Sequence, residues 1–134
     1  MQLHITIVPH TLAVSRLHAG DAFPDWARGA FVSITRTSEE LSVVCDEGHV
    51  PESVTAERGW TLLKVEGPIP FETTGVASAL VAPLAKAKIS VFPIATYDTD
   101  YLLVKADALV AAIDALRSAG HVVNDHVVNG SAGA

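Results

Sequence analysis

The residues with the clearest chemistry lie in the polar turn Thr96-Tyr97-Asp98-Thr99-Asp100, which joins two apolar segments of the chain. This turn carries two carboxylates and three hydroxyl groups. A short polar turn between two buried strands places such groups together at one edge of a sheet. Carboxylates attract cations and hydroxyls add hydrogen bonds, so this edge is predicted to hold something small and positively charged.

A second set of candidates precedes a predicted helix. The segment Gly67-Pro68-Ile69-Pro70 predicts a rigid turn, after which Thr73 or Thr74 can cap the helix. The first N–H groups of a helix and the positive end of its dipole bind anions. Gly75 would let a ligand approach the backbone closely. The candidate ligand-binding residues here are Gly67, Glu72, Thr73, Thr74, Gly75 and Val76.

Together, the two sets offer one group of residues for an anion and another for a cation. The helix start would bind the anionic group, and Asp98 or Asp100 the cationic one, with the Thr96 and Thr99 hydroxyls adding hydrogen bonds. Glu72 is a further candidate contact for a cationic side chain. The residues also allow simpler roles. Either threonine can be an ordinary cap, and the two aspartates can satisfy backbone donors of their own turn.

The second half of the chain alternates predicted strands and helices in a recognisable order. The helix after Thr73 or Thr74 should contain Pro83, which is expected to kink or restart it. The order β-α-β-β-α-β is typical of an α+β, ferredoxin-like fold with two helices on one face of a four-stranded antiparallel sheet. The predicted strands are Trp60–Glu66, Ile89–Ala95, Tyr101–Lys105 and His121–Val123, and the apolar helix positions are Val76, Leu80, Leu84, Leu109, Ala112, Ile113 and Leu116.

The first half predicts a degraded version of the same unit, with a loop at residues 20–29 in place of its first helix. Predicted strands cover residues 3–8 and 12–17, with a break at 9–11, and then Ala30–Thr35 and Leu41–Cys45. A short helix is predicted over Pro51–Arg58. The predicted domains are therefore an N-terminal degenerate unit (1–59), a complete unit (60–123) and a flexible tail (124–134).

Composition narrows the classes of function. The chain has 134 residues, of which 49% are hydrophobic and 18% charged, so it is expected to fold. Its surplus of apolar residues suggests burial against another copy, or an apolar lipid-binding cavity. The net charge of −6 and the scattered basic residues argue against nucleic acid as a partner.

Several other possibilities find no support in the residue pattern. No apolar run is long enough for a membrane span and no secretory signal is visible, which favours the cytoplasm. Cys45 is the single cysteine, which excludes an internal disulfide, and it is predicted to be an inert core thiol. The six histidines have no metal-site spacing, so no metal and no cofactor is predicted.

The run ISVFPIATYDTDYLLV, preceded by WTLLKVEGPIPFETTGVASALVAPLAKA, resembles the small bacterial ACT-domain proteins related to the arginine sensors of the animal growth-signalling pathway. Pro93 and Ala95 depart from the usual pattern of that strand. The resemblance implies tandem ACT units, pairing of sheets between units, and a free amino acid bound at the seam between them. With that ligand, the carboxylate of the amino acid would lie at the helix start and its ammonium group at Asp98 or Asp100. The resemblance does not imply catalysis.

The leading hypothesis is therefore a non-catalytic, cytoplasmic sensor or regulatory protein that binds a free amino acid between ACT units, as a homodimer or higher homo-oligomer. The alternative is a structural or oligomeric interaction module without a small-molecule ligand. A small enzyme on the ferredoxin-like scaffold ranks last, because the sequence shows no pairing of a nucleophile with a base.

Overall fold

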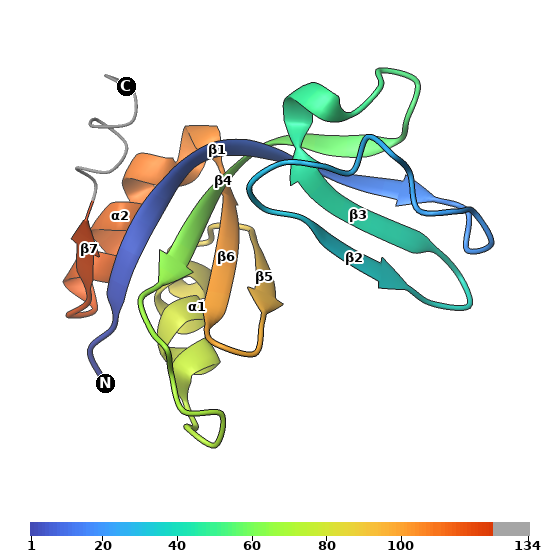
Figure 1. Ribbon diagram of the computed structural model, residues 1–134. Helices are drawn as coiled ribbons and strands as arrows, with labels where there is room; N and C mark the ends of the chain where they lie inside the picture. Colours follow the sequence, from blue (N-terminus) through green and yellow to red (C-terminus); the bar gives the residue numbers. More distant parts are fainter. Residues whose placement is uncertain (125–134) are drawn as a thin grey trace. The chain divides into compact units, whose positions relative to one another are not determined.

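The computed structural model describes residues 1–124 (Figure 1). The chain divides into two compact units. Unit 1 contains Met1–Pro9 and the chain from Thr61 onward, and unit 2 contains His10–Trp60. The two longest strands, β1 (His4–Leu17) and β4 (Ala56–Val65), each contribute residues to both units. Of the predicted tail, all residues after Asn124 lie outside the described residues.

The sheet of unit 1 has the strand order β7-β1-β4-β6-β5 in the described part of the chain. Strands β5 (Val91–Ala95) and β6 (Asp100–Lys105) pair antiparallel and form the hairpin that carries the polar turn. Strand β7 (Val122–Asn124) pairs parallel with the beginning of β1. The predicted α+β class and the β-α-β-β-α-β order over the second half of the chain are confirmed.

The prediction of a four-stranded antiparallel sheet is wrong in one respect, which is the position of the last strand. The N-terminal part of β1 lies between β4 and β7, so the last strand does not pair with β4. This segment fits there because Leu3, Ile5 and Ile7 alternate along it and are all buried in the core of unit 1. The paired segments are far apart in the chain, so no local sequence pattern predicts their pairing.

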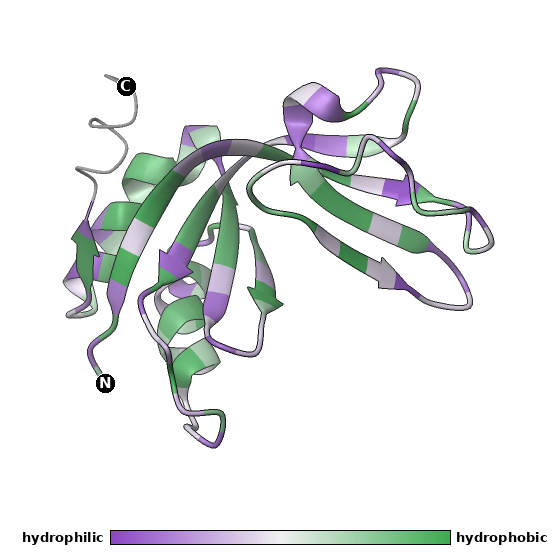
Figure 2. Cartoon of the chain, viewed as in Figure 1, coloured by the Kyte–Doolittle hydropathy of each residue, from purple (hydrophilic) through white to green (hydrophobic). Residues whose placement is uncertain are grey.

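Helices α1 (Val76–Lys86) and α2 (Leu109–Ser118) pack against the sheet of unit 1 (Figure 1). A turn of 3-10 helix, η2 (Ala106–Ala108), leads into α2. The predicted apolar faces are confirmed, since their members are buried or packed against the same core. Figure 2 shows the apolar positions as green bands on the helices and strands. The buried helix residues are Val76, Leu80, Leu84, Ala112, Ile113 and Leu116.

Helix α1 continues through Pro83, so the predicted restart of the helix does not occur. A proline in a helix lacks the N–H that would bond to the carbonyl four residues earlier, here that of Ala79. The ring of His121 supplies the missing donor, because its Nε2 lies 2.8 Å from the Ala79 carbonyl oxygen. A side chain that follows α2 thus replaces the hydrogen bond that Pro83 removes from α1.

The cap of α1 also differs from the prediction. Gly75 occupies the cap position with a φ of 84°, and no side chain caps the helix. Thr73 and Thr74 therefore do not have the capping role that the sequence suggested. Glycine reaches this left-handed backbone conformation without the steric cost that a side chain would add.

Unit 2 is built from β2 (Ser33–Arg36), β3 (Leu41–Asp46) and the neighbouring parts of β1 and β4, in the order β2-β3-β1-β4. Strand β3 pairs antiparallel with both β1 and β2. The 3-10 helix η1 (Glu47–His49) follows β3. The buried residues of its core are Ala13, Leu41, Val43, Cys45 and Val50.

The predictions for the first half are partly confirmed. The hairpin of β2 and β3 is present, although β2 begins at Ser33 rather than Ala30. The helix predicted over Pro51–Arg58 is wrong, since β4 begins at Ala56. The break predicted at residues 9–11 is also wrong, because β1 is continuous through Pro9. In both places strand pairing overrides the local preference of the residues. The reading of residues 1–59 as a degenerate ACT unit stays a prediction.

Candidate functional site

The polar turn and the start of α1 line one pocket in unit 1, with a volume of about 310 Å³. We call it the turn pocket. It contains residues from both predicted sets, so the structure brings the helix start and the acidic turn together within a single chain. Its lining residues are Ile69, Pro70, Phe71, Thr73, Gly75, Val76, Ala77, Ala95, Thr96, Tyr97, Asp98, Thr99 and Asp100.

Three of the predicted ligand-binding residues lie outside the lining of the turn pocket. Glu72 and Thr74 are exposed beside it but do not line it. Gly67 lines a separate depression of about 250 Å³ together with Lys64. Asp98 and Thr99 line both cavities, so the two adjoin at the polar turn.

The polar turn is held by the two threonines. The Thr96 hydroxyl donates to the Thr99 carbonyl oxygen at 2.9 Å and accepts from the Thr99 N–H at 3.3 Å. Thr99 is buried, and its hydroxyl donates to the Val65 carbonyl oxygen at 2.6 Å, which fastens the turn to β4. Both hydroxyl protons are therefore used inside the protein. Only the acceptor side of either hydroxyl remains for the ligand contacts that the sequence predicted.

This arrangement does not use the carboxylates of the two aspartates. Within residues 1–124, the carboxylates of Asp98 and Asp100 make no hydrogen bond or ion pair. The simpler role, in which they satisfy backbone donors of the turn, is thus carried out by Thr96 instead. Asp98 is exposed and Asp100 is half-buried, and both line the turn pocket.

The opposite side of the pocket is the start of α1. A side chain placed at Gly75 would meet no atom within 4 Å, so the space above this residue is open. The first N–H groups of α1 have no partner inside the helix, as at every helix start. The Ile69 N–H donates to the Asp98 carbonyl oxygen at 2.8 Å, which ties the loop before α1 to the polar turn. An anion at the helix start would lie in the same pocket as the two carboxylates.

Two aromatic residues that line the turn pocket were not among the ligand-binding residues predicted from the sequence. Phe71 precedes α1 and Tyr97 lies in the polar turn, and their ring centroids are 5.3 Å apart. A role for Tyr97 could have been predicted from the sequence, because an aromatic ring in a turn of acidic residues and threonines has no apolar core to pack into. Phe71 carried no comparable signal, since apolar residues between two predicted elements often pack inward.

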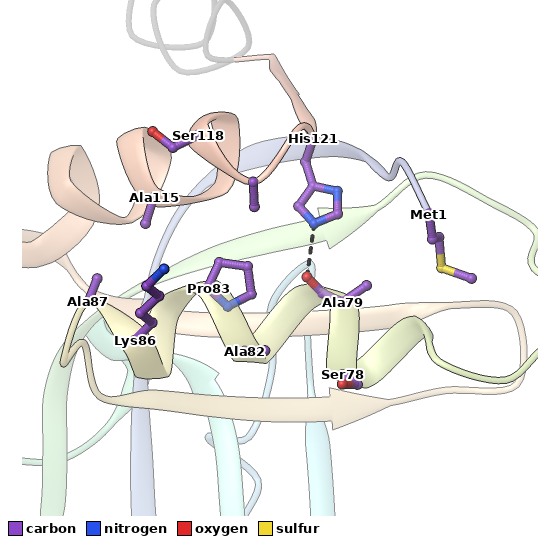
Figure 3. Close-up of a pocket in the computed structure, with 11 residues that line it drawn as sticks. Met1, Ser78, Ala79, Ala82, Pro83, Lys86, Ala87, Ala115, Ser118 and His121 are labelled. Carbon is purple, nitrogen blue, oxygen red and sulfur yellow. Dashed lines mark hydrogen bonds between the residues drawn. The ribbon is translucent and has the colours of Figure 1, made fainter.

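A larger depression of about 650 Å³ lies between α1 and α2 (Figure 3). We call it the helix groove. His121 is its buried polar side chain, and both ring nitrogens are engaged, since Nδ1 accepts from the Leu3 N–H at 3.0 Å. Lys86 is the charged side chain in its lining. The lining residues are Met1, Ser78, Ala79, Ala82, Pro83, Lys86, Ala87, Ala115, Ser118, Ala119 and His121.

Other reactive groups in the described chain are not gathered into a site. Residues 1–124 contain no group of three or more histidine, cysteine or carboxylate side chains placed to hold a metal ion. Burial raises the pKa of the Cys45 thiol, so this cysteine is a weak nucleophile. Among the same residues, no helix is long and apolar enough to cross a membrane.

Comparison with known families agrees with the fold. A family model described as an ACT domain matches residues 55–118, and a model described as an N-terminal domain matches residues 10–53. In addition, protein Atu0741 from Agobacterium tumefaciens has a solved structure that superimposes with a TM-score of 0.88. Its sequence is 38% identical, and the match covers 92% of this chain and 93% of that protein. The chain belongs to the ACT-domain family.

Other proteins to which the chain is similar are larger. The bovine cytosolic arginine sensor for mTORC1, subunit 1, is 33% identical over an alignment of 104 positions, and the match covers 69% of this chain and 32% of the sensor. The chain thus spans about a third of the length of that relative. The aspartate kinase of Clostridium acetobutylicum superimposes with a TM-score of 0.61 at 11% identity, over 81% of this chain and 33% of the kinase, which shows similarity of fold alone.

Proposed function

We propose that this ACT-family chain is a non-catalytic regulatory protein that binds a free amino acid in the turn pocket. One observation carries the proposal: the start of α1 and two unpaired carboxylates line the same cavity of unit 1. These are the two kinds of group that a zwitterion needs, donors for its carboxylate and acceptors for its ammonium.

The geometry supports a definite orientation of the ligand. The carboxylate of the amino acid would lie above Gly75, where the open space allows contact with the N–H groups of Val76 and Ala77. Positively charged groups of the ligand would face Asp98 and Asp100. The hydrogen bonds of Thr96 and Thr99 hold the turn in place, which reduces the ordering cost of binding.

The regulatory role follows from the family and stays part of the proposal. A ligand can shift a protein between two arrangements only if it binds one of them more tightly. We propose that an ACT unit of a second copy covers the open side of the turn pocket, so that the ligand stabilises one form of a homodimer or higher homo-oligomer. No cofactor is needed for this role.

L-arginine is the first amino acid to test, because the mammalian relatives are named arginine sensors. Thermal melting against the twenty amino acids is the direct experiment. A ligand at 100 times its dissociation constant adds about 2.7 kcal/mol to the free energy of unfolding, so a specific binder will raise the melting temperature. Asp98→Ala and Asp100→Ala should reduce that rise.

Asp114→Ala is the matched control for these variants. Asp114 is an exposed carboxylate on α2 that does not line the turn pocket, so its loss changes the net charge by the same amount. The control should keep the full ligand-dependent rise. If no amino acid shifts the melting temperature, the chain is better described as an interaction module. If the pocket variants behave like the control, the ligand binds elsewhere.

A further inference from the structure

The aromatic pair of the turn pocket is unusual in its exposure. Phe71 is 75% exposed and Tyr97 is 81% exposed, although their rings contact each other with an interplanar angle of 35°. The pair joins the loop before α1 to the polar turn. Because neither ring is buried in the core, each retains accessible aromatic surface at the mouth of the pocket. Aromatic faces attract cations through the negative charge of their π-systems.

The charges of the lining point in the same direction. Among residues 1–124, Asp98 and Asp100 are the charged side chains that line the turn pocket, and no lysine, arginine or histidine lines it. An anionic ligand side chain would meet repulsion there, and a neutral one would gain nothing from these charges. A cationic side chain would be attracted both by the carboxylates and by the ring faces.

The same chain already shows this kind of contact in unit 2. The guanidinium carbon of Arg36 lies 5.1 Å from the centroid of the Phe23 ring. Its nitrogens donate hydrogen bonds to the carbonyl oxygens of Ala19 and Asp21. A guanidinium is planar and weakly hydrated, so it can stack on a ring and donate at its edges at the same time.

We infer that Phe71 and Tyr97 are specificity-determining residues that select an amino acid with a guanidinium side chain. This inference rests on the proposed function, because it assigns the side-chain end of the same ligand. The guanidinium stacks on the exposed ring surface, and its N–H groups donate to the carboxylate of Asp98. Lysine fits less well because its ammonium is a compact, strongly hydrated charge that does not stack.

The test is titration calorimetry of the full chain with L-arginine, L-lysine and L-citrulline, whose side chain has a similar shape without the charge. Phe71→Leu and Tyr97→Leu keep an apolar side chain and remove the ring. Each should weaken arginine binding about two- to fivefold, the loss expected for an exposed cation–ring contact. Citrulline binding should change less, and Tyr97→Phe should retain the wild-type preference for arginine.

Phe23→Leu is the matched control, because Phe23 is 60% exposed but belongs to unit 2. Unchanged arginine affinity in the Phe71→Leu and Tyr97→Leu variants would overturn the inference. Equal losses for arginine and citrulline would also overturn it, since the rings would then provide only apolar contact. A chain that binds a neutral amino acid instead keeps the proposed function and loses this inference. A chain that binds no amino acid loses both.

Discussion

Two depressions border α1, and they differ in how their polar groups are satisfied. In the helix groove, His121 uses both ring nitrogens, and the Ala79 carbonyl that Pro83 leaves without a donor is bonded. In the turn pocket, the start of the helix and the carboxylates of Asp98 and Asp100 face the cavity. The groove has about twice the volume of the pocket, but its buried polar groups are occupied by structural bonds.

The difference shows that cavity size is a poor guide to function in this fold. A ligand gains affinity and specificity from polar groups that the protein leaves available to it. The groove is lined mainly by small side chains, whereas the smaller pocket presents donors on one side and acceptors on the other. Three changes test this contrast between a structural site and a binding site.

The largest effect is expected at His121, on the structural side of the comparison. His121→Phe should lower the free energy of unfolding by about 2–4 kcal/mol, because it leaves the buried Leu3 N–H and the half-buried Ala79 carbonyl without partners. Amino-acid affinity of the folded protein should stay unchanged. Chemical denaturation measures the first quantity, and calorimetry in the absence of denaturant measures the second.

Pro83→Ala provides the control through a double-mutant cycle. Alanine at position 83 has an N–H that can bond to the Ala79 carbonyl, so this carbonyl no longer depends on His121. In the Pro83→Ala background, His121→Phe should therefore cost about 1 kcal/mol less than in the wild type. Strictly additive effects would show that the two residues do not share this carbonyl.

A smaller effect is expected at Thr99, which supports the turn pocket from behind. Thr99→Val should destabilise the protein by about 1–2 kcal/mol, since it removes the buried bond to the Val65 carbonyl oxygen. It should also weaken amino-acid binding, because the turn loses its attachment to β4. Thr96→Val, at an exposed position of the same turn, should cost less stability in the same denaturation experiment. Equal costs would contradict the role given to the Thr99–Val65 bond.

The contrast also explains how much could be predicted from the sequence. The acidic turn and the two helices are defined by neighbouring residues, and the turn pocket follows from their proximity in the fold. The position of β1 between β4 and β7 depends on pairing across the whole chain, which no local pattern reveals. The hydrogen bond from His121 to the carbonyl that Pro83 leaves without a donor could not be predicted either, because no sequence pattern connects the two residues.

The roles of several threonines in the site could not be predicted, because each side chain had two possible interactions. Thr73 and Thr74 have side chains that can cap a helix. The residue directly before α1 has a left-handed backbone conformation, however, and Gly75 occupies this position because glycine adopts that conformation easily. The hydroxyls of Thr96 and Thr99 looked available for a ligand, but neighbouring carbonyl groups use their protons. In each case the residue type was compatible with two roles, and the backbone geometry decided between them.

The smallest effect in stability, and the most specific effect in binding, is expected at Gly75. Gly75→Asn places a side chain in the open space above the helix start, where the ligand carboxylate is proposed to bind. Asparagine tolerates the left-handed conformation better than most residues, so the loss of stability should be about 0.5 kcal/mol. Arginine affinity, measured by calorimetry, should fall at least about fivefold, because the added side chain competes for the first N–H groups of α1.

Gly120→Asn is the matched control for this variant. Gly120 also has a left-handed backbone, with a φ of 94°, and a side chain placed there would likewise meet no atom within 4 Å. It lies after α2 and does not line the turn pocket. The two variants should therefore cost similar stability and differ in affinity. If both leave affinity unchanged, the ligand does not reach the start of α1. The turn pocket would then have to bind through its acidic side alone.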